Sequence, residues 1–269
     1  MRFVILHYHF LKNAGMSIES ILHRSFGSFF CSIDTEERDG HITGEALLDH
    51  LRRHPLLKAV SSHQIRYPVP RVAGFLFFDL CFLRDPIDRV RSTYDYFREK
   101  PSVGDPVSDF ANQLTLGGFI ARLIEEMPWH INDAQVNLLA NGIANDPPTR
   151  RDFERAVSKM LQTSFLGVVD RFNESLMAGQ HFLRPVFPAL DCSAEMENVS
   201  AKRAAGVHEA CDPGVYAELV RLNAYDLKLV DLARAEVERR FTKASPLILP
   251  VGRTPHIVTV APNEGPATR

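Results

Sequence analysis

FVILHYHFLKNAGMS, residues 3–17, is the stretch that decides the fold. It opens with Phe3-Val4-Ile5-Leu6, a short apolar run typical of a strand buried on both faces of a parallel sheet. The polar turn Lys12-Asn13-Ala14-Gly15 follows, and apolar residues then recur at helical spacing. The stretch therefore predicts a buried strand, a tight loop and a helix from about Met16 to Ser25.

The rest of the chain repeats this alternation of strand and helix. Strands are expected at Ala59–Ser62, Gly74–Leu83 and Phe165–Val169. The alternation predicts an α/β, P-loop-like three-layer fold, with a central parallel sheet flanked by helices and a helix-rich C-terminal half. Further helices are expected at Glu45–Arg53, from Pro86, and at Ser108–Leu116, Gly118–Glu126, Asp133–Ala140, Thr149–Leu161, Phe172–Phe182 and Val215–Phe241.

Composition bounds the class of protein. The chain has 269 residues, 45% of them hydrophobic and 24% charged, with a net charge of −2, which indicates a globular domain and argues against disorder. The near-neutral charge disfavours nucleic-acid binding through a basic field. We expect one domain over 1–244 and an extended or loose tail over 245–269, where prolines occur without periodicity.

The cellular location is predicted from the targeting and membrane signals that we do not find in the sequence. No apolar run approaches the roughly 18 residues of a membrane span, and the first residues do not resemble a signal peptide. The cysteines are scattered without a CxxC pair, so neither a zinc knuckle nor a disulfide framework is indicated. These features predict a reduced, cytoplasmic protein without a membrane span.

The first candidate site is the loop at Leu11–Ser17, between the first strand and its helix. Small residues let the backbone close around a phosphate, and the helix N-terminus directs free N–H groups at it. Lys12 can add a positive charge and Ser17 a hydroxyl donor. A Walker A loop would place its lysine after the last glycine, whereas Lys12 precedes Gly15, so an ordinary NTPase is disfavoured.

The second candidate site follows the strand at Gly74–Leu83. Arg84 ends that strand and Ser92 lies about two helical turns later, so a guanidinium fork and a hydroxyl can bind one phosphate. Arg89 and Arg91 point to different helix faces, and we expect both to be solvated, with i,i+4 ion pairs such as that of Asp85 with Arg89.

Together the two loops resemble the sulfotransferases that use 3′-phosphoadenosine 5′-phosphosulfate (PAPS), in particular the heparan and dermatan uronyl 2-O-sulfotransferase branch. The first loop of that family reads H-I-P-K-T-G/A-G-T-S and the second R-D-P-x-x-R-x-x-S-x-Y. Leu11 and Met16 depart from the first pattern, replacing a proline and a hydroxyl residue. The residues matching these patterns and later family segments, in the same order, are His9–Ser17, Arg84–Tyr94, Asn132–Leu139, Phe165–Phe172, Glu197–Ser200 and Asn223–Asp226.

The resemblance implies a function and roles for residues. PAPS would be the donor, its sulfuryl group passing in line to a hydroxyl, expected to be that of a carbohydrate, without a metal. Lys12 would stabilise charge on the leaving phosphate, and Arg84 with Ser92 would hold the 3′-phosphate. The remaining donor-binding positions in the first loop are Asn13, Ala14, Gly15, Met16 and Ser17.

The general base is expected to be His63, because it ends a strand and an imidazole titrates near neutral pH. Asp79 and Glu19 are weaker candidates. A loop carrying Asn198, Ser200 and Lys202 is expected to close over the donor. The missing anchor differs from Golgi members of the branch and suggests a bacterial enzyme.

Two alternatives stay open. A catalytically silent nucleotide-binding protein on the same fold would account for Leu11 and Met16. A metal-dependent hydrolase could use His7 and His9, which face the same side of a strand, although the sequence offers no third histidine at a recognisable spacing. The acceptor and the oligomeric state cannot be read from the sequence.

Overall fold

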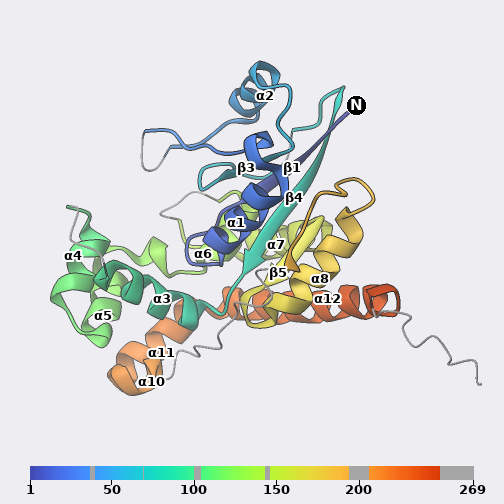
Figure 1. The fold of residues 1–269 in the computed structure, drawn as a ribbon. Helices are drawn as coiled ribbons and strands as arrows, with labels where there is room; N and C mark the ends of the chain where they lie inside the picture. Colours follow the sequence, from blue (N-terminus) through green and yellow to red (C-terminus); the bar gives the residue numbers. More distant parts are fainter. Residues whose placement is uncertain (37–39, 69, 100–103, 143–145, 194–205, 249–269) are drawn as a thin grey trace, which may run out of the picture.

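The computed structural model describes residues 1–36, 40–68, 70–99, 104–142, 146–193 and 206–248. Its centre is a five-stranded sheet in the order β2-β3-β1-β4-β5, with every neighbouring pair parallel. The expected α/β fold around a parallel sheet is confirmed (Figure 1). The strands are β1 (Arg2–Tyr8), β2 (Phe30–Ser32), β3 (Ala59–Ser62), β4 (Phe75–Leu83) and β5 (Phe165–Val168).

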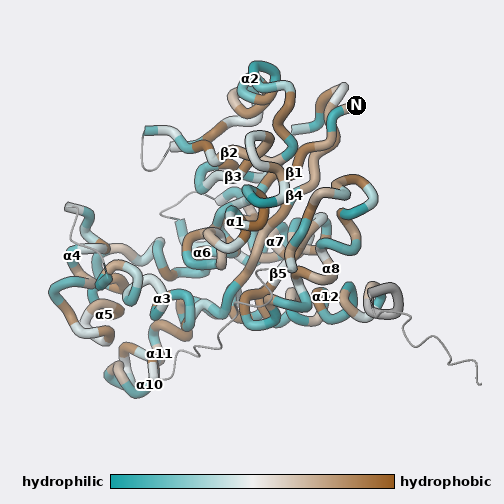
Figure 2. Tube along the Cα trace, viewed as in Figure 1, coloured by the Kyte–Doolittle hydropathy of each residue, from teal (hydrophilic) through white to brown (hydrophobic). Residues whose placement is uncertain are grey.

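Helices cover both faces of the sheet and give three layers. Successive residues of β1 point to opposite faces, so Ile5 packs against one layer while Val4 and Leu6 pack against the other. The Ile5 side holds α1 (Gly15–Phe26) and α8 (Phe172–Leu183). The opposite side holds α2 (Gly44–Arg53), α6 (Ala134–Ala140), α7 (Arg150–Gln162) and α12 (Ala224–Ile248). Figure 2 shows the hydrophobic residues concentrated along the central strands, between these layers.

A second group of helices lies beyond the carboxyl end of β4 (Figure 1). It has its own apolar cluster, which includes Tyr94, Phe119 and Leu219. This group positions the helix that follows Arg84. Its members are α3 (Pro86–Arg98), α4 (Pro106–Gln113), α5 (Leu116–Glu126), α10 (Val207–Ala210) and α11 (Pro213–Leu222).

The chain leaves β1 and β4 toward opposite faces. The helix after β1 is α1, whereas α6 and α7, which follow β4, cover the other face. Adjacent strands whose connections diverge in this way leave a crevice outside their carboxyl ends, where open α/β sheets bind ligands. Both candidate loops emerge at this point.

Two expectations about the C-terminal half are wrong. The helix expected over Val215–Phe241 is broken at Asn223, whose side-chain amide donates to the carbonyl of Leu219 and ends α11. The tail was expected from residue 245, but α12 continues to Ile248, since packing of its buried Val237 and Ala244 carries the helix past that boundary. Residues 249–269 are outside the described ranges.

β2 and α10 had no counterpart in the sequence analysis, because three or four residues show no periodicity. β2 is fixed by its parallel pairing with β3. Within the described ranges, no helix combines the length and apolar character needed to cross a bilayer.

Candidate functional site

The first loop turns sharply between β1 and α1. Lys12 and Ala14 adopt left-handed backbone conformations, with φ of 64° and 61°. Ala14 is the N-cap of α1 and offers no side-chain hydrogen bond to the helix, and no acidic residue stands in the first turn. The first N–H groups of a helix lack intrahelical partners, so this N-terminus has the electrostatic character of an anion site.

Gly15 is required here by close contact with His9. A Cβ at position 15 would lie 1.9 Å from both Cδ2 and Nε2 of the His9 ring. The His9 imidazole thus fills the space beside Gly15, the first residue of α1. This contact places the first loop next to a group of histidines.

The second loop begins at Arg84 and is shaped by the start of α3. The Asp85 carboxylate accepts hydrogen bonds from the backbone N–H groups of Ile87 and Asp88, and Pro86 occupies the first helical turn. The arginine at the end of β4 is thereby directed to the carboxyl edge of the sheet.

The two loops are in direct contact. Arg84 Nη1 donates to the backbone carbonyl of Lys12 at 3.1 Å. Burial lowers the pKa of Arg84, and the nearby carboxylates of Asp88 and Asp85 oppose that shift. Arg84 Nε is buried and makes no hydrogen bond within the described part of the chain.

Lys12 also reaches the helix that carries Ser92. Its Nζ lies 4.1 Å from the centroid of the Tyr96 ring, a cation–π distance. Ser92 and Tyr96 are one turn apart on the same face of α3. Lys12, Arg84 and the Ser92 face of α3 therefore lie together, as the two-loop prediction requires.

Arg89 in α3 differs from the prediction, whereas Arg91 forms an i,i+4 ion pair with Asp95 at 2.9 Å, of the kind expected. Arg89 is buried, not solvated, and donates to the carbonyl of His130 at 2.7 Å. It forms no ion pair with Asp85, whose carboxylate caps α3 and lies 3.6 Å from Arg234. Helix spacing alone could not reveal that α5 and its neighbours cover this face.

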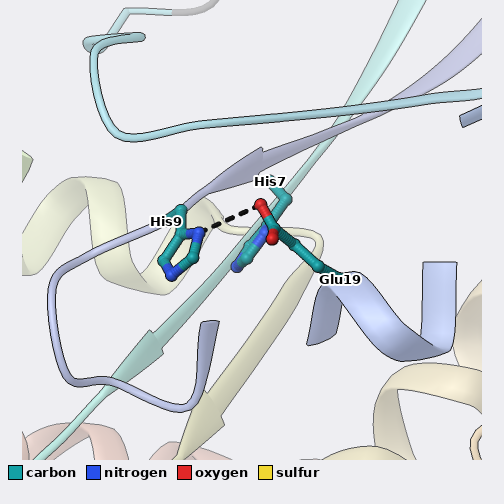
Figure 3. Close-up of side chains that lie close together, drawn as sticks. All are labelled: His7, His9 and Glu19. Carbon is teal, nitrogen blue, oxygen red and sulfur yellow. Dashed lines mark hydrogen bonds and ion pairs between the residues drawn. The ribbon is translucent and has the colours of Figure 1, made fainter. Parts of the chain in front are cut away.

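A cluster of histidines occupies the carboxyl ends of β1 and β3. His7 and His9, two residues apart, point to the α1 side, where Glu19 meets them (Figure 3). The His7 and His9 rings stack at 5.3 Å, and His9 and His63 stack at 3.9 Å. His63, the expected base, therefore stacks directly on His9, whose imidazole lies against Gly15.

Hydrogen bonds fix the orientation of the two inner rings. Ser61 Oγ donates to Glu19 Oε1 at 2.7 Å, so Ser61 must accept from His7 Nδ1 at 2.8 Å. The same carboxylate oxygen lies 3.1 Å from His9 Nδ1. A carboxylate only accepts, so His9 also carries its proton on Nδ1.

Electrostatics keep these rings neutral. Burial, with added repulsion from neighbouring imidazoles, lowers the pKa of His7 well below its ordinary value. Burial and His63 lower the pKa of His9 more than Glu19 raises it. Burial alone would raise the pKa of Glu19, but the hydrogen bonds that its carboxylate accepts from Ser61, His9 and Ser32 outweigh it, so the net shift is downward.

His63 differs from the other two because 43% of its side chain is exposed. Asp34 holds it: Oδ2 lies 2.9 Å from His63 Nδ1, and Oδ1 accepts from the His63 backbone N–H at 3.0 Å. Nδ1 donates to the carboxylate, so that in the neutral imidazole Nε2 keeps its lone pair. The sequence analysis missed Asp34, although an acidic residue just after the short Phe30–Ser32 run could have signalled it.

His7, His9 and Glu19 could also hold a metal, since their ligand atoms lie within 4.8 Å of one another. Neutral imidazoles and a carboxylate suit zinc or iron. Both Nδ1 atoms, however, are already donors to Ser61 and Glu19. An ion would have to replace these hydrogen bonds or use Nε2.

Other candidates are placed elsewhere. Asp79 accepts from the Ser164 backbone and hydroxyl, both at 2.9 Å, and lines a hollow of about 400 Å³ with Phe75 and Leu76, toward the amino end of β4. It is therefore remote from the two loops and unsuited to be their base. Asn198, Ser200 and Lys202 lie outside the described residues.

Comparisons with known proteins give one distant relative and no function. No protein-family model matches the chain. A protein of Archaeoglobus fulgidus, described as uncharacterized, is 24% identical over 247 residues, which cover 86% of this chain and 97% of the archaeal protein. The function therefore has to be argued from the geometry of the site.

Proposed function

We propose that the protein is a sulfotransferase that moves a sulfuryl group from PAPS to an acceptor hydroxyl. One observation carries the proposal: the hydrogen bond from Arg84 to the Lys12 carbonyl, at the divergence of β1 and β4. It joins two anion-binding elements far apart in the sequence, which suits a nucleotide with separate anionic groups at its 5′ and 3′ positions.

The 5′-phosphosulfate is assigned to the first loop. Backbone N–H groups of Gly15, Met16 and Ser17 at the uncapped start of α1 would bind its oxygens, and Lys12 would stabilise the charge that develops on the leaving phosphate. Met16 is 74% exposed and lacks the usual hydroxyl, so its contribution would come from its backbone N–H.

The 3′-phosphate is assigned to Arg84 and Ser92. The guanidinium can offer its Nη2 donors to an oxyanion while Nη1 holds Lys12. The Ser92 hydroxyl makes no hydrogen bond to any described residue. An arginine and a hydroxyl at this position would distinguish PAPS from ATP, which has no 3′-phosphate.

Transfer itself needs a base for the acceptor. The acceptor oxygen would attack sulfur while the sulfur–oxygen bond to the 5′-phosphate breaks, and His63 Nε2 would take the hydroxyl proton. Asp34 supports this role by holding Nδ1. The products would be a sulfate ester and adenosine 3′,5′-bisphosphate. A carbohydrate acceptor and a cytoplasmic location remain part of the proposal.

Transfer of radiolabelled sulfate from PAPS to a panel of sugars tests the assignment. Lys12→Ala should abolish transfer, and Arg84→Ala should mainly weaken donor binding. Lys159→Ala and Arg71→Ala serve as matched controls, because both residues line the distant hollow. Full activity of Lys12→Ala would refute its role, and an unchanged rate and pH profile for His63→Ala would reject that base.

Two other functions give different results in the same experiments. A silent nucleotide-binding protein would bind adenosine 3′,5′-bisphosphate at micromolar concentration without transferring sulfate. A hydrolase built on His7, His9 and Glu19 would bind no bisphosphate and would need a divalent metal for activity.

A further inference from the structure

The buried side chain of Gln135, in α6, hydrogen-bonds to both candidate loops. Its side chain is 1% exposed. Oε1 accepts from Asn13 Nδ2 at 2.8 Å and from the Arg84 backbone N–H at 3.0 Å. Nε2 donates to the Arg84 carbonyl at 2.8 Å and to Asp226 Oδ2 at 3.2 Å. Both acceptor positions and both N–H groups of the amide are therefore used.

Asn13 completes the connection on the side of the first loop. It is 2% exposed, and its Nδ2 donates to the carbonyl of Phe82 at 2.8 Å as well as to Gln135. Asn13 directly follows Lys12 and precedes the N-cap of α1. The first loop is thus attached both to β4 and to the amide that holds the second loop.

The position of Gln135 is itself fixed by two helices that cap one another. Asp226, in the first turn of α12, accepts from the backbone N–H groups of Gln135 and Val136 at 3.0 and 2.8 Å. Asp133, the N-cap of α6, accepts from the backbone N–H groups of Tyr225 and Asp226 at 2.8 and 2.7 Å. Each helix start is satisfied by a carboxylate of the other, so neither can shift alone.

We infer that Gln135 is a positioning residue that sets the separation of the two anion-binding loops, so that one ligand with two phosphates engages both at once. The inference rests on the proposed function. A ligand with two groups gains from the second one only when the two sites stand at the right distance beforehand. Without the Gln135 amide each loop keeps its own donors, but their relative position is no longer fixed.

The test compares two ligands that carry one phosphate, and so bind to one loop each, with a ligand whose two phosphates bind to both loops. Dissociation constants are measured by calorimetry for adenosine 5′-monophosphate, adenosine 3′-monophosphate and adenosine 3′,5′-bisphosphate. Gln135→Leu removes all four hydrogen bonds at similar volume. Asn223→Leu is the matched control, because it removes another buried amide that contacts neither loop.

Gln135→Leu should weaken bisphosphate binding by about tenfold or more while both monophosphates bind within about twofold of wild type. Asn223→Leu should leave all three constants unchanged. Equal weakening of all three ligands by Gln135→Leu, or no weakening of any, would overturn the inference. Should this variant not fold, Asp226→Asn gives the same comparison without touching either loop. No bisphosphate binding by the wild-type protein would instead refute the proposed function.

Discussion

Gly15→Ala is the substitution whose effect the structure defines most sharply. The new methyl group would lie 1.9 Å from two atoms of the His9 ring, where carbon atoms need about 3.5–4.0 Å. The ring has no free space to enter, because it is 6% exposed, stacked on His63 and bonded to Glu19. The backbone at Gly15 is not left-handed, so the methyl contact alone sets the penalty.

The magnitude follows from these contacts. Overpacking a filled site costs about 1–3 kcal/mol, and losing the His9 hydrogen bond to a carboxylate costs about 1.5–3 kcal/mol more. Alanine recovers up to about 1 kcal/mol of helix propensity. Together these contributions predict that Gly15→Ala lowers the free energy of unfolding by about 1.5–6 kcal/mol.

Urea unfolding followed by circular dichroism measures this loss, in a double-mutant cycle with His9→Ala. Once the ring is removed the methyl group fits, so Gly15→Ala should then cost almost nothing. Gly118→Ala, at the start of α5 with its nearest neighbour at 3.4 Å, is the matched control and should be neutral or stabilising. A loss below about 1 kcal/mol, or an equal loss with and without His9, would refute the reasoning.

Three further outcomes are expected. Burial raises the pKa of Asp133 to about 7, so between about pH 4 and 7 the native state retains a proton that the unfolded state has lost, and stability falls as pH rises. Asp133→Asn should remove this fall and raise the free energy of unfolding, measured by thermal unfolding at pH 8, by up to about 4 kcal/mol, whereas an equal gain at pH 4 would contradict the assignment. Ala14→Gly should raise the free energy of unfolding by about 0.5–1 kcal/mol, because glycine adopts the φ of 61° at this position without strain. A lower stability of this variant in urea unfolding would argue against backbone strain at Ala14. Asp34→Asn should slow sulfate transfer about tenfold or more without changing bisphosphate affinity, because His63 then lacks its carboxylate partner. A parallel loss of bisphosphate affinity would show that Asp34 acts on the donor instead.

The sequence by itself determined the class of fold and the identity of the two loops. The apolar run Val4–Leu6 is buried on both faces of its strand as predicted, although Phe3 before it is exposed, and Pro86 after Arg84 marks a helix start. These preferences act over a few neighbouring residues. Lys12 lies within the first loop, and Arg84 and Ser92 both lie within the second, so each motif is also a local pattern. Local patterns therefore sufficed to place these elements and to name their charged side chains.

Only the tertiary structure decided which side chains meet. The contact that buries Arg89, the pairing of His63 with Asp34 and the link through Gln135 all join segments distant along the chain. A hydrogen bond between such segments depends on how strands are ordered and helices layered, and no short-range periodicity carries that information. The carboxyl ends of β1 and β4 are neighbours only because the sheet places these two strands side by side.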